Sequence, residues 1–236
     1  MTYEKMHTPA AHRFDRKFNR LKGTVFIVTY GRSGSTLLQN LLMTIPGCVI
    51  RGENHNMMEP IWQAAMRCRM TRGTWGQEHR PPTHPWHGAD GIRPWPFAAS
   101  MIDGFVDHVL CPPPEARWFG FKEIRYNALG GHFVEILDFM AAHFKNAHFV
   151  FNTRRIEDVM KSAWWTEWKP DEITVLAHDM DRRFADYHDA HPSRTRITRY
   201  EEFATDPGAL RDVFDMLKEP MDRDRIQAVL RQRLSH

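Results

Sequence analysis

Short apolar runs rich in β-branched and aromatic residues alternate along this chain with longer stretches in which apolar residues recur at helical spacing. That alternation is typical of α/β proteins in which a parallel sheet carries helices on both faces. We therefore predict an α/β fold with a parallel sheet and helices on both faces. The predicted strands cover residues 25–29, 48–50, 118–124, 148–152 and 196–198.

The first strand and the helix after it are clearly delimited in the sequence. Apolar residues between Leu37 and Ile45 repeat at helical spacing directly after a Gly/Ser-rich turn, and Pro46-Gly47 ends the pattern. The first unit is therefore predicted to be a strand, a tight turn and a helix. Near the other end of the chain, residues 222–234 are predicted to form a charged amphipathic helix.

The amino-acid composition changes between residues 67 and 96, where tryptophans and histidines are interleaved with prolines. This pattern predicts a long irregular insertion, and such loops in compact domains are commonly functional lids. The tryptophans argue against disorder. No carboxylate or cysteine lies at ligand spacing from the histidines, so a metal site is not expected.

Length and composition favour one domain spanning residues 1–236, with 1–22 as an N-terminal extension. The 236 residues, 42% hydrophobic and 26% charged, suffice for a full core. A net charge of +3 is too small for a protein that coats nucleic acid, so a small ligand is expected. No apolar run resembles a signal peptide or a membrane span, which predicts a cytoplasmic protein. Cys48, Cys68 and Cys111 are expected to be buried thiols.

The most informative segment is the turn from Gly31 to Thr36, between the first strand and its helix. The first N–H groups of a helix have no intrahelical partner and lie at the positive end of its dipole, so such a turn can bind an anion. Arg32 adds a positively charged guanidinium with paired N–H donors, and Ser33, Ser35 and Thr36 add hydroxyls around Gly34. The alternative is a capped helix with a surface arginine. A nucleotide kinase loop would carry a Lys before the Ser/Thr, which this turn lacks.

The segment from Thr29 to Leu38 resembles the 5′-phosphosulfate loop of the sulfotransferase family, in which a Lys or Arg precedes Ser-Gly-[ST]-[ST]. A second family signature is an Arg at the end of a later strand and a Ser eight positions on, which together bind the nucleotide's 3′-phosphate. Arg154 and Ser162 match it, and the segment from Arg199 to Phe203 resembles a third motif whose Tyr, here Tyr200, lies near the nucleotide.

This resemblance implies the P-loop-like α/β fold of sulfotransferases over roughly residues 24–217, closer to the bacterial and Golgi-type branches. It implies 3′-phosphoadenosine-5′-phosphosulfate as the co-substrate, no metal, and Arg32, Ser33, Gly34, Ser35, Thr36, Arg154, Ser162 and Tyr200 as its binding residues. The Arg-Lys-Gly segment that helps hold the 3′-phosphate in the branch acting on phenols and steroids is not found in this sequence.

For the catalytic base, Glu53 follows the second predicted strand and resembles the Gly-Glu base of the tyrosylprotein branch. A closed pocket can raise the pKa of such a carboxyl toward neutrality. Glu53 as a helix cap and His55 as the base are the alternatives. Lys122, in the third predicted strand, could contact the leaving oxygen, or could pair with Glu53 or Glu123.

The sequence therefore predicts transfer of a sulfuryl group to a hydroxyl, or less favourably an amine, of a small-molecule, carbohydrate or lipid-type acceptor. Arg32, Glu53 and Lys122 are the predicted catalytic residues, and the insertion 67–96 is predicted to cover the acceptor. Two alternatives remain at this point: a P-loop kinase-like phosphotransferase and a non-catalytic nucleotide-binding regulatory protein.

Overall fold

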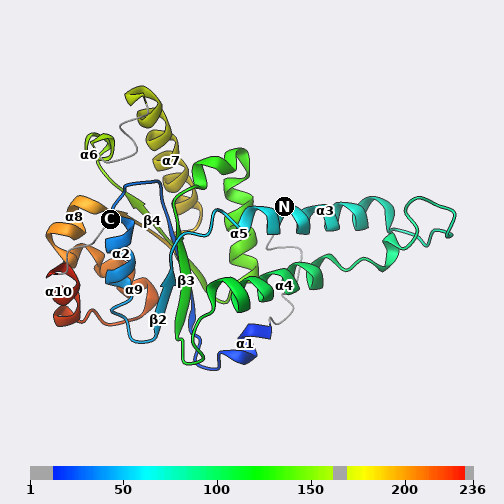
Figure 1. Cartoon of the computed structure of the whole chain (residues 1–236), viewed down its shortest axis with the longest axis horizontal. Helices are drawn as coiled ribbons and strands as arrows, with labels where there is room; N and C mark the ends of the chain where they lie inside the picture. Colours follow the sequence, from blue (N-terminus) through cyan, green and yellow to red (C-terminus); the bar gives the residue numbers. More distant parts are fainter. Residues whose placement is uncertain (1–12, 162–168, 232–236) are drawn as a thin grey trace.

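The computed structural model describes residues 13–161 and 169–231, and its centre is a five-stranded parallel sheet. The strand order is β2-β3-β1-β4-β5 (Figure 1). Each predicted strand is present, with boundaries that differ by a residue or two. The strands are β1 (Gly23–Val28), β2 (Cys48–Arg51), β3 (Trp118–Glu123), β4 (Ala147–Thr153) and β5 (Thr195–Arg199).

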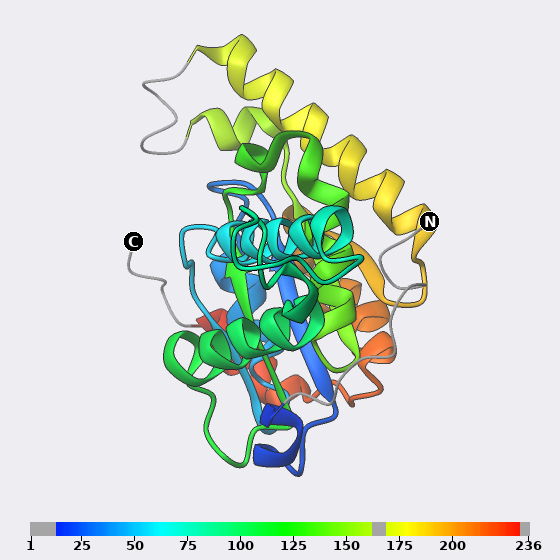
Figure 2. The same cartoon turned by 90° about the vertical axis from the view of Figure 1, so that its right-hand side faces the viewer.

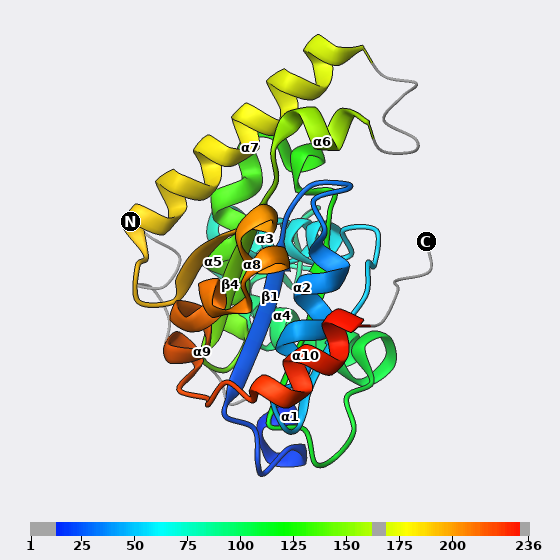
Figure 3. The same ribbon diagram turned by 90° about the vertical axis from the view of Figure 1, so that its left-hand side faces the viewer.

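Helices cover both faces of this sheet, which confirms the predicted fold class (Figures 1 and 3). In β1, Val25 and Ile27 pack into one buried cluster and Phe26 and Val28 into the other, as the two-residue period of a strand requires. One face carries α1 (Arg13–Lys17), α3 (Met58–Trp75), α4 (Pro94–Phe105), α5 (Phe133–His143) and α7 (Pro170–Ala190). The other carries α2 (Ser35–Leu42), α8 (Tyr200–Thr205), α9 (Arg211–Leu217) and α10 (Arg223–Arg231).

Shorter segments complete the described chain. They are a 3₁₀ turn at Ala89–Gly91, a π-helical segment at Val106–Leu110 that continues α4, a 3₁₀ segment at Tyr126–His132, α6 (Ile156–Met160) and a 3₁₀ turn at Pro207–Leu210. The predicted tail helix corresponds to α10.

The strand order places β1 in the middle of the sheet, where the direction of chain winding reverses. From β1 the chain crosses to β2 at one edge, whereas the connection from β3 to β4 passes over β1 to the other half. Parallel α/β sheets bind ligands at the carboxyl ends of their strands at such a reversal. The turn after β1 lies at this position.

The segment from α3 through α4 forms an arm that projects from the body of the domain in Figure 1 and points toward the viewer in Figure 2. At 1.5 Å per residue, the 18 residues of α3 extend about 27 Å. The predicted irregular insertion 67–96 is therefore partly helical, because α3 continues to Trp75 and α4 begins at Pro94. The distal half of α3 buries little, so no apolar stripe marks it as a helix in the sequence.

Of the three cysteines, only Cys48 is buried, which corrects the prediction for the other two. Burial, followed by the charge of Glu219, raises the pKa of Cys48 to about 12, so this thiol stays protonated. Cys68 is partly exposed on α3. Cys111 is exposed because the helical segment ends there in a left-handed residue, at φ 42°.

None of the helices within residues 13–161 and 169–231 combines the length and apolar character that crossing a bilayer requires. Within the same residues, no three His, Cys, Asp or Glu side chains are grouped to hold a metal ion.

Candidate active site

A cavity of about 570 Å³ opens at the carboxyl edge of the sheet, beside the turn after β1. Five segments that are distant in sequence contribute to it: the β1 turn, the loop after β2, and the ends of β3, β4 and β5. Nearly all the predicted site residues meet here. Its lining is Arg32, Gly34, Ser35, Thr36, Leu37, Glu53, Lys122, Ile124, Arg125, Arg154 and Tyr200.

The β1 turn adopts left-handed backbone conformations at two positions. Arg32 has φ 63° and Gly34 has φ 77°, and α2 begins immediately after Gly34. A Cβ atom at position 34 would overlap the ring of Tyr200, so both the conformation and the space require glycine. The turn and Tyr200 are thereby in close contact across the cavity.

Buried polar side chains beneath the turn fix its shape. The Thr29 hydroxyl lies 2.7 Å from the Ser33 hydroxyl and donates to the Asn152 carbonyl at 2.6 Å, while the Asn152 amide donates to the Ser33 carbonyl at 2.8 Å. Ser33 is fully buried and does not line the cavity, unlike its predicted partners Ser35 and Thr36. Thr29 and Asn152 were not predicted, although both are polar residues at the carboxyl ends of apolar strands.

Arg154, at the end of β4, connects the turn to Tyr200. Its Nη1 donates to the Arg32 carbonyl at 2.9 Å, and its guanidinium carbon lies 4.4 Å from the centre of the Tyr200 ring, a cation–π contact. The Arg154 Nε is buried and has no hydrogen-bond partner among the described residues. This nitrogen leaves one buried donor for a ligand. Ser162, its predicted partner, lies outside the described residues.

Tyr30 holds the backbone of Arg154. The Tyr30 hydroxyl accepts the Arg154 N–H at 3.0 Å and donates to the Arg154 carbonyl at 3.2 Å. Burial, followed by the nearby Asp181 carboxylate, raises the pKa of Tyr30, so the hydroxyl retains its proton. The position of Arg154 therefore depends on β1 as well as on β4.

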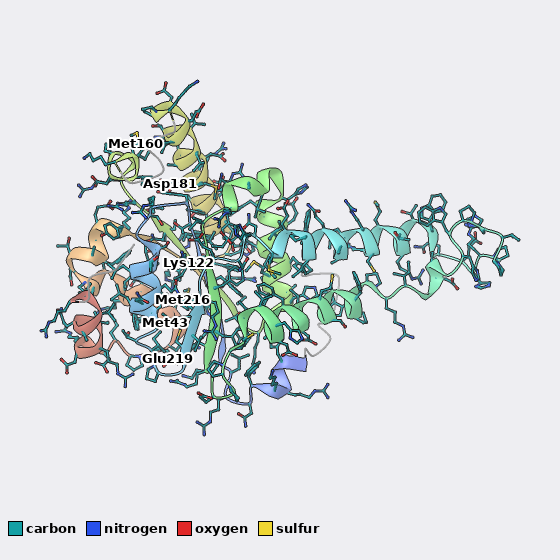
Figure 4. All side chains as sticks on the ribbon, viewed as in Figure 1. Met43, Lys122, Met160, Asp181, Met216 and Glu219 are labelled. Carbon is teal, nitrogen blue, oxygen red and sulfur yellow. The ribbon has the colours of Figure 1, made fainter. Side chains whose placement is uncertain are left out.

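On the opposite side of the cavity, Glu53 pairs with two cations. Its Oε1 lies 2.7 Å from Lys122 Nζ, and its Oε2 lies 2.9 Å from Arg125 Nη1. The side chain of Glu53 is 31% exposed, whereas that of Lys122 is 8% exposed and lies at the end of β3 (Figure 4). Of the two partners considered for Lys122, the structure pairs it with Glu53. Arg125 was not predicted as a site residue.

The alternatives to Glu53 as the base have different positions in the structure. His55 is exposed, has φ 55° and does not line the cavity. At the start of α3, the side chain that accepts a backbone N–H is Asn54, whose Oδ1 binds the Met57 N–H at 3.0 Å. The two oxygens of Glu53 instead bind Lys122 and Arg125.

Glu123, the last residue of β3, is a fully buried carboxylate directly behind this group. Burial alone would raise the pKa of Glu123, but N–H groups of Asn56, Asn54, Ile124 and Arg125 donate to its oxygens and together hold the pKa below its usual value. The carboxylate is therefore ionised within the protein. The sequence signal for this residue was the charged pair Lys122-Glu123 in an otherwise apolar strand. The backbone N–H groups that bind its carboxylate could not be predicted from the sequence.

The insertion does not reach the cavity in this conformation. No residue between 67 and 96 lines it, and the tip of the arm lies at the far end of α3 (Figures 1 and 4). Parallel Trp75 and Trp86 rings, 5.3 Å apart, order that tip. Covering of an acceptor by this segment stays a prediction, and it would require the arm to move.

The chain thus has a cavity lined by arginine, lysine and hydroxyl side chains at the carboxyl edge of a parallel α/β sheet. The profile of the Sulfotransferase family matches residues 24–223. The chain belongs to the sulfotransferase family and is a sulfotransferase enzyme. No curated protein matches the chain.

Two solved structures of similar fold are sulfotransferase domains. The sulfotransferase domain from the Synechococcus PCC 7002 olefin synthase has a TM-score of 0.56 and 16% identity, covering 96% of this chain and 79% of that one. The sulfotransferase domain from the curacin biosynthetic pathway has a TM-score of 0.50 and 16% identity, covering 90% of this chain and 79% of that one. At this identity the likeness concerns the fold.

Proposed function

We propose that this enzyme transfers the sulfuryl group of 3′-phosphoadenosine-5′-phosphosulfate to a hydroxyl, or less favourably an amine, of a small-molecule, carbohydrate or lipid-type acceptor. The observation that carries the proposal is the convergence of the β1 turn, Arg154 and Tyr200 on one cavity. Two features fit such a donor: the buried, unpartnered Arg154 Nε, and Gly34, where any side chain would meet Tyr200.

In this proposal the donor binds along the carboxyl edge of the sheet. The first amides of α2, the hydroxyls of Ser35 and Thr36, and Arg32 bind the 5′-phosphosulfate, because they combine a helix terminus with a fixed guanidinium. Arg154 binds the 3′-phosphate, and Tyr200 packs against Arg154. Ser162 as a second 3′-phosphate ligand remains a proposal from the sequence.

Sulfuryl transfer needs a base for the acceptor proton and positive charge at the leaving oxygen. Glu53 takes the proton of the acceptor hydroxyl as that oxygen forms its bond to sulfur. Lys122 neutralises the phosphate oxygen that keeps the electron pair when the old sulfur–oxygen bond breaks. The 2.7 Å contact between Glu53 and Lys122 places both groups at one point of the cavity.

Binding and transfer assays test this function against the two alternatives. Tight binding of 3′,5′-bisphosphoadenosine without magnesium, together with transfer of labelled sulfuryl to one of a panel of hydroxyl and amine acceptors, is the expected result. Magnesium-dependent ATP binding would instead indicate a kinase-like enzyme. Nucleotide binding with neither transfer nor donor hydrolysis would indicate a regulatory protein.

Arg154→Ala is expected to reduce the preference for 3′,5′-bisphosphoadenosine over 5′-AMP by at least ~10-fold, the usual effect of losing a charge-assisted hydrogen bond. The ratio of the two dissociation constants, from calorimetry, is the quantity to measure, because the contact of Arg154 with the Arg32 carbonyl supports both ligands. Arg155→Ala is the matched control, since Arg155 is exposed and does not line the cavity. An unchanged ratio in Arg154→Ala would exclude the assigned role.

A further inference from the structure

The loop that carries Glu53 has an unusual backbone. His55 and Asn56 are consecutive non-glycine residues in the left-handed region, with φ 55° and φ 54°. Left-handed backbone is unfavourable for residues that have a Cβ atom. This conformation therefore needs compensating interactions, and the described contacts show what supplies them.

The compensation comes mainly from Glu123. One of its oxygens, Oε2, accepts the N–H groups of Asn54 and Asn56, both at 3.0 Å. The other, Oε1, accepts the N–H groups of Ile124 at 2.7 Å and Arg125 at 3.1 Å, and lies 3.2 Å from Arg125 Nη1. One buried carboxylate thus binds both the loop after β2 and the end of β3.

Arg125 completes the link between this buried carboxylate and the cavity. The same Nη1 that contacts Glu123 also binds Glu53 Oε2 at 2.9 Å. In addition, the Asn56 side chain donates to the Arg125 carbonyl at 2.6 Å. The positions of Glu53 and Arg125 are therefore both tied to Glu123, although Glu123 itself does not line the cavity.

We propose that Glu123 is a positioning residue of the transfer reaction, which acts by holding the loop of Glu53 in its left-handed conformation and by orienting Arg125 against Glu53. The inference rests on the proposed function, in which Glu53 is the base. Glu123 does not line the cavity in which the proposed function places donor and acceptor, so its removal is expected to affect turnover rather than donor binding.

Glu123→Gln tests this role, because the amide keeps the size of the side chain but cannot accept from all five N–H donors. We expect kcat to fall ~10- to 10²-fold, the usual effect of a small misplacement of a catalytic group. The dissociation constant of 3′,5′-bisphosphoadenosine should stay within about threefold. Hydrogen exchange of the Asn54 and Asn56 amides should become faster, a local change that a merely structural role elsewhere would not cause.

Glu219 offers a matched control at the other end of β3 (Figure 4). Its buried carboxylate binds Lys22 at 2.7 Å, Arg117 at 2.7 Å and Trp118 Nε1 at 2.9 Å. Glu219→Gln should lower thermal stability while leaving kcat of the folded enzyme within about twofold and the Asn54 and Asn56 exchange unchanged. If Glu123→Gln fails to fold, Glu123→Asp retains the charge but is too short to reach both loop amides, and the same changes are expected.

The outcomes separate this inference from the proposed function. Unchanged amide exchange in the Glu123 variants, or faster exchange with unchanged kcat, would overturn the positioning role. An equal loss of kcat in Glu219→Gln would also overturn it, because the effect would then be general. If the wild-type protein transfers no sulfuryl group, the proposed function fails, and the amide exchange alone decides whether Glu123 holds the loop.

Discussion

Replacing Glu53 with Gln is expected to lower turnover by ~10²- to 10⁴-fold while the affinity for 3′,5′-bisphosphoadenosine survives. The amide keeps the shape of the side chain, and its oxygen can still accept from Lys122, whose ammonium is nearly buried. It cannot take the proton of the acceptor. Single-turnover rates with saturating donor, compared with nucleotide affinities from calorimetry, measure the two effects separately.

His55→Ala is the companion variant, because His55 is the neighbouring group able to act as a base. Since His55 is exposed and does not line the cavity, its replacement should change turnover by no more than about threefold, within the range of surface substitutions. The opposite pattern, with activity lost in His55→Ala and kept in Glu53→Gln, would make His55 the base.

Arg32→Ala is expected to reduce kcat/KM by ~10²-fold or more, as removal of one preorganised donor to a transition state does. The side chain lines the cavity at the start of α2, and its backbone carbonyl is held by Arg154. Alanine preserves that carbonyl, so the loss should come from the guanidinium. Steady-state kinetics with varied donor provide the measurement.

Arg32→Lys distinguishes the contribution of the paired N–H donors of the guanidinium from that of its positive charge. A lysine retains a point charge without paired donors, so an intermediate loss is expected. A reduction below threefold in Arg32→Ala would contradict the assigned role of this residue.

The three central strands, β1, β3 and β4, were predictable because their side chains are buried on both faces of the sheet. All six residues of β1 are buried, and a strand of this kind appears in the sequence as a continuous apolar run. Their order in the sheet was not predictable, since it depends on which strands pair and not on any one segment. The arm escaped prediction because the distal half of α3 lacks the apolar periodicity from which a helix is inferred.

The residues brought together in the cavity were mostly predictable because short motifs carry them. Their supports were not, because Thr29, Asn152 and Glu123 act through contacts with residues distant in sequence. The ion-pair partner of Lys122 shows why such contacts could not be predicted from the sequence. Glu123 adjoins it in sequence, but adjacent strand residues point to opposite faces, and the carboxylate it meets is Glu53, 69 residues away.

The alternation of β1 side chains between the two hydrophobic clusters has a consequence for donor binding under the proposed function. Because β1 packs into both clusters, we expect it to open only when much of the domain unfolds, and we expect the turn that follows it to keep its shape before any ligand binds. Under the proposed function, we therefore expect the nucleotide to bind without ordering this turn, so that little conformational entropy is lost on its side of the cavity. The heat-capacity change on binding should accordingly reflect only the surface covered by the ligand, without the larger signature of coupled folding.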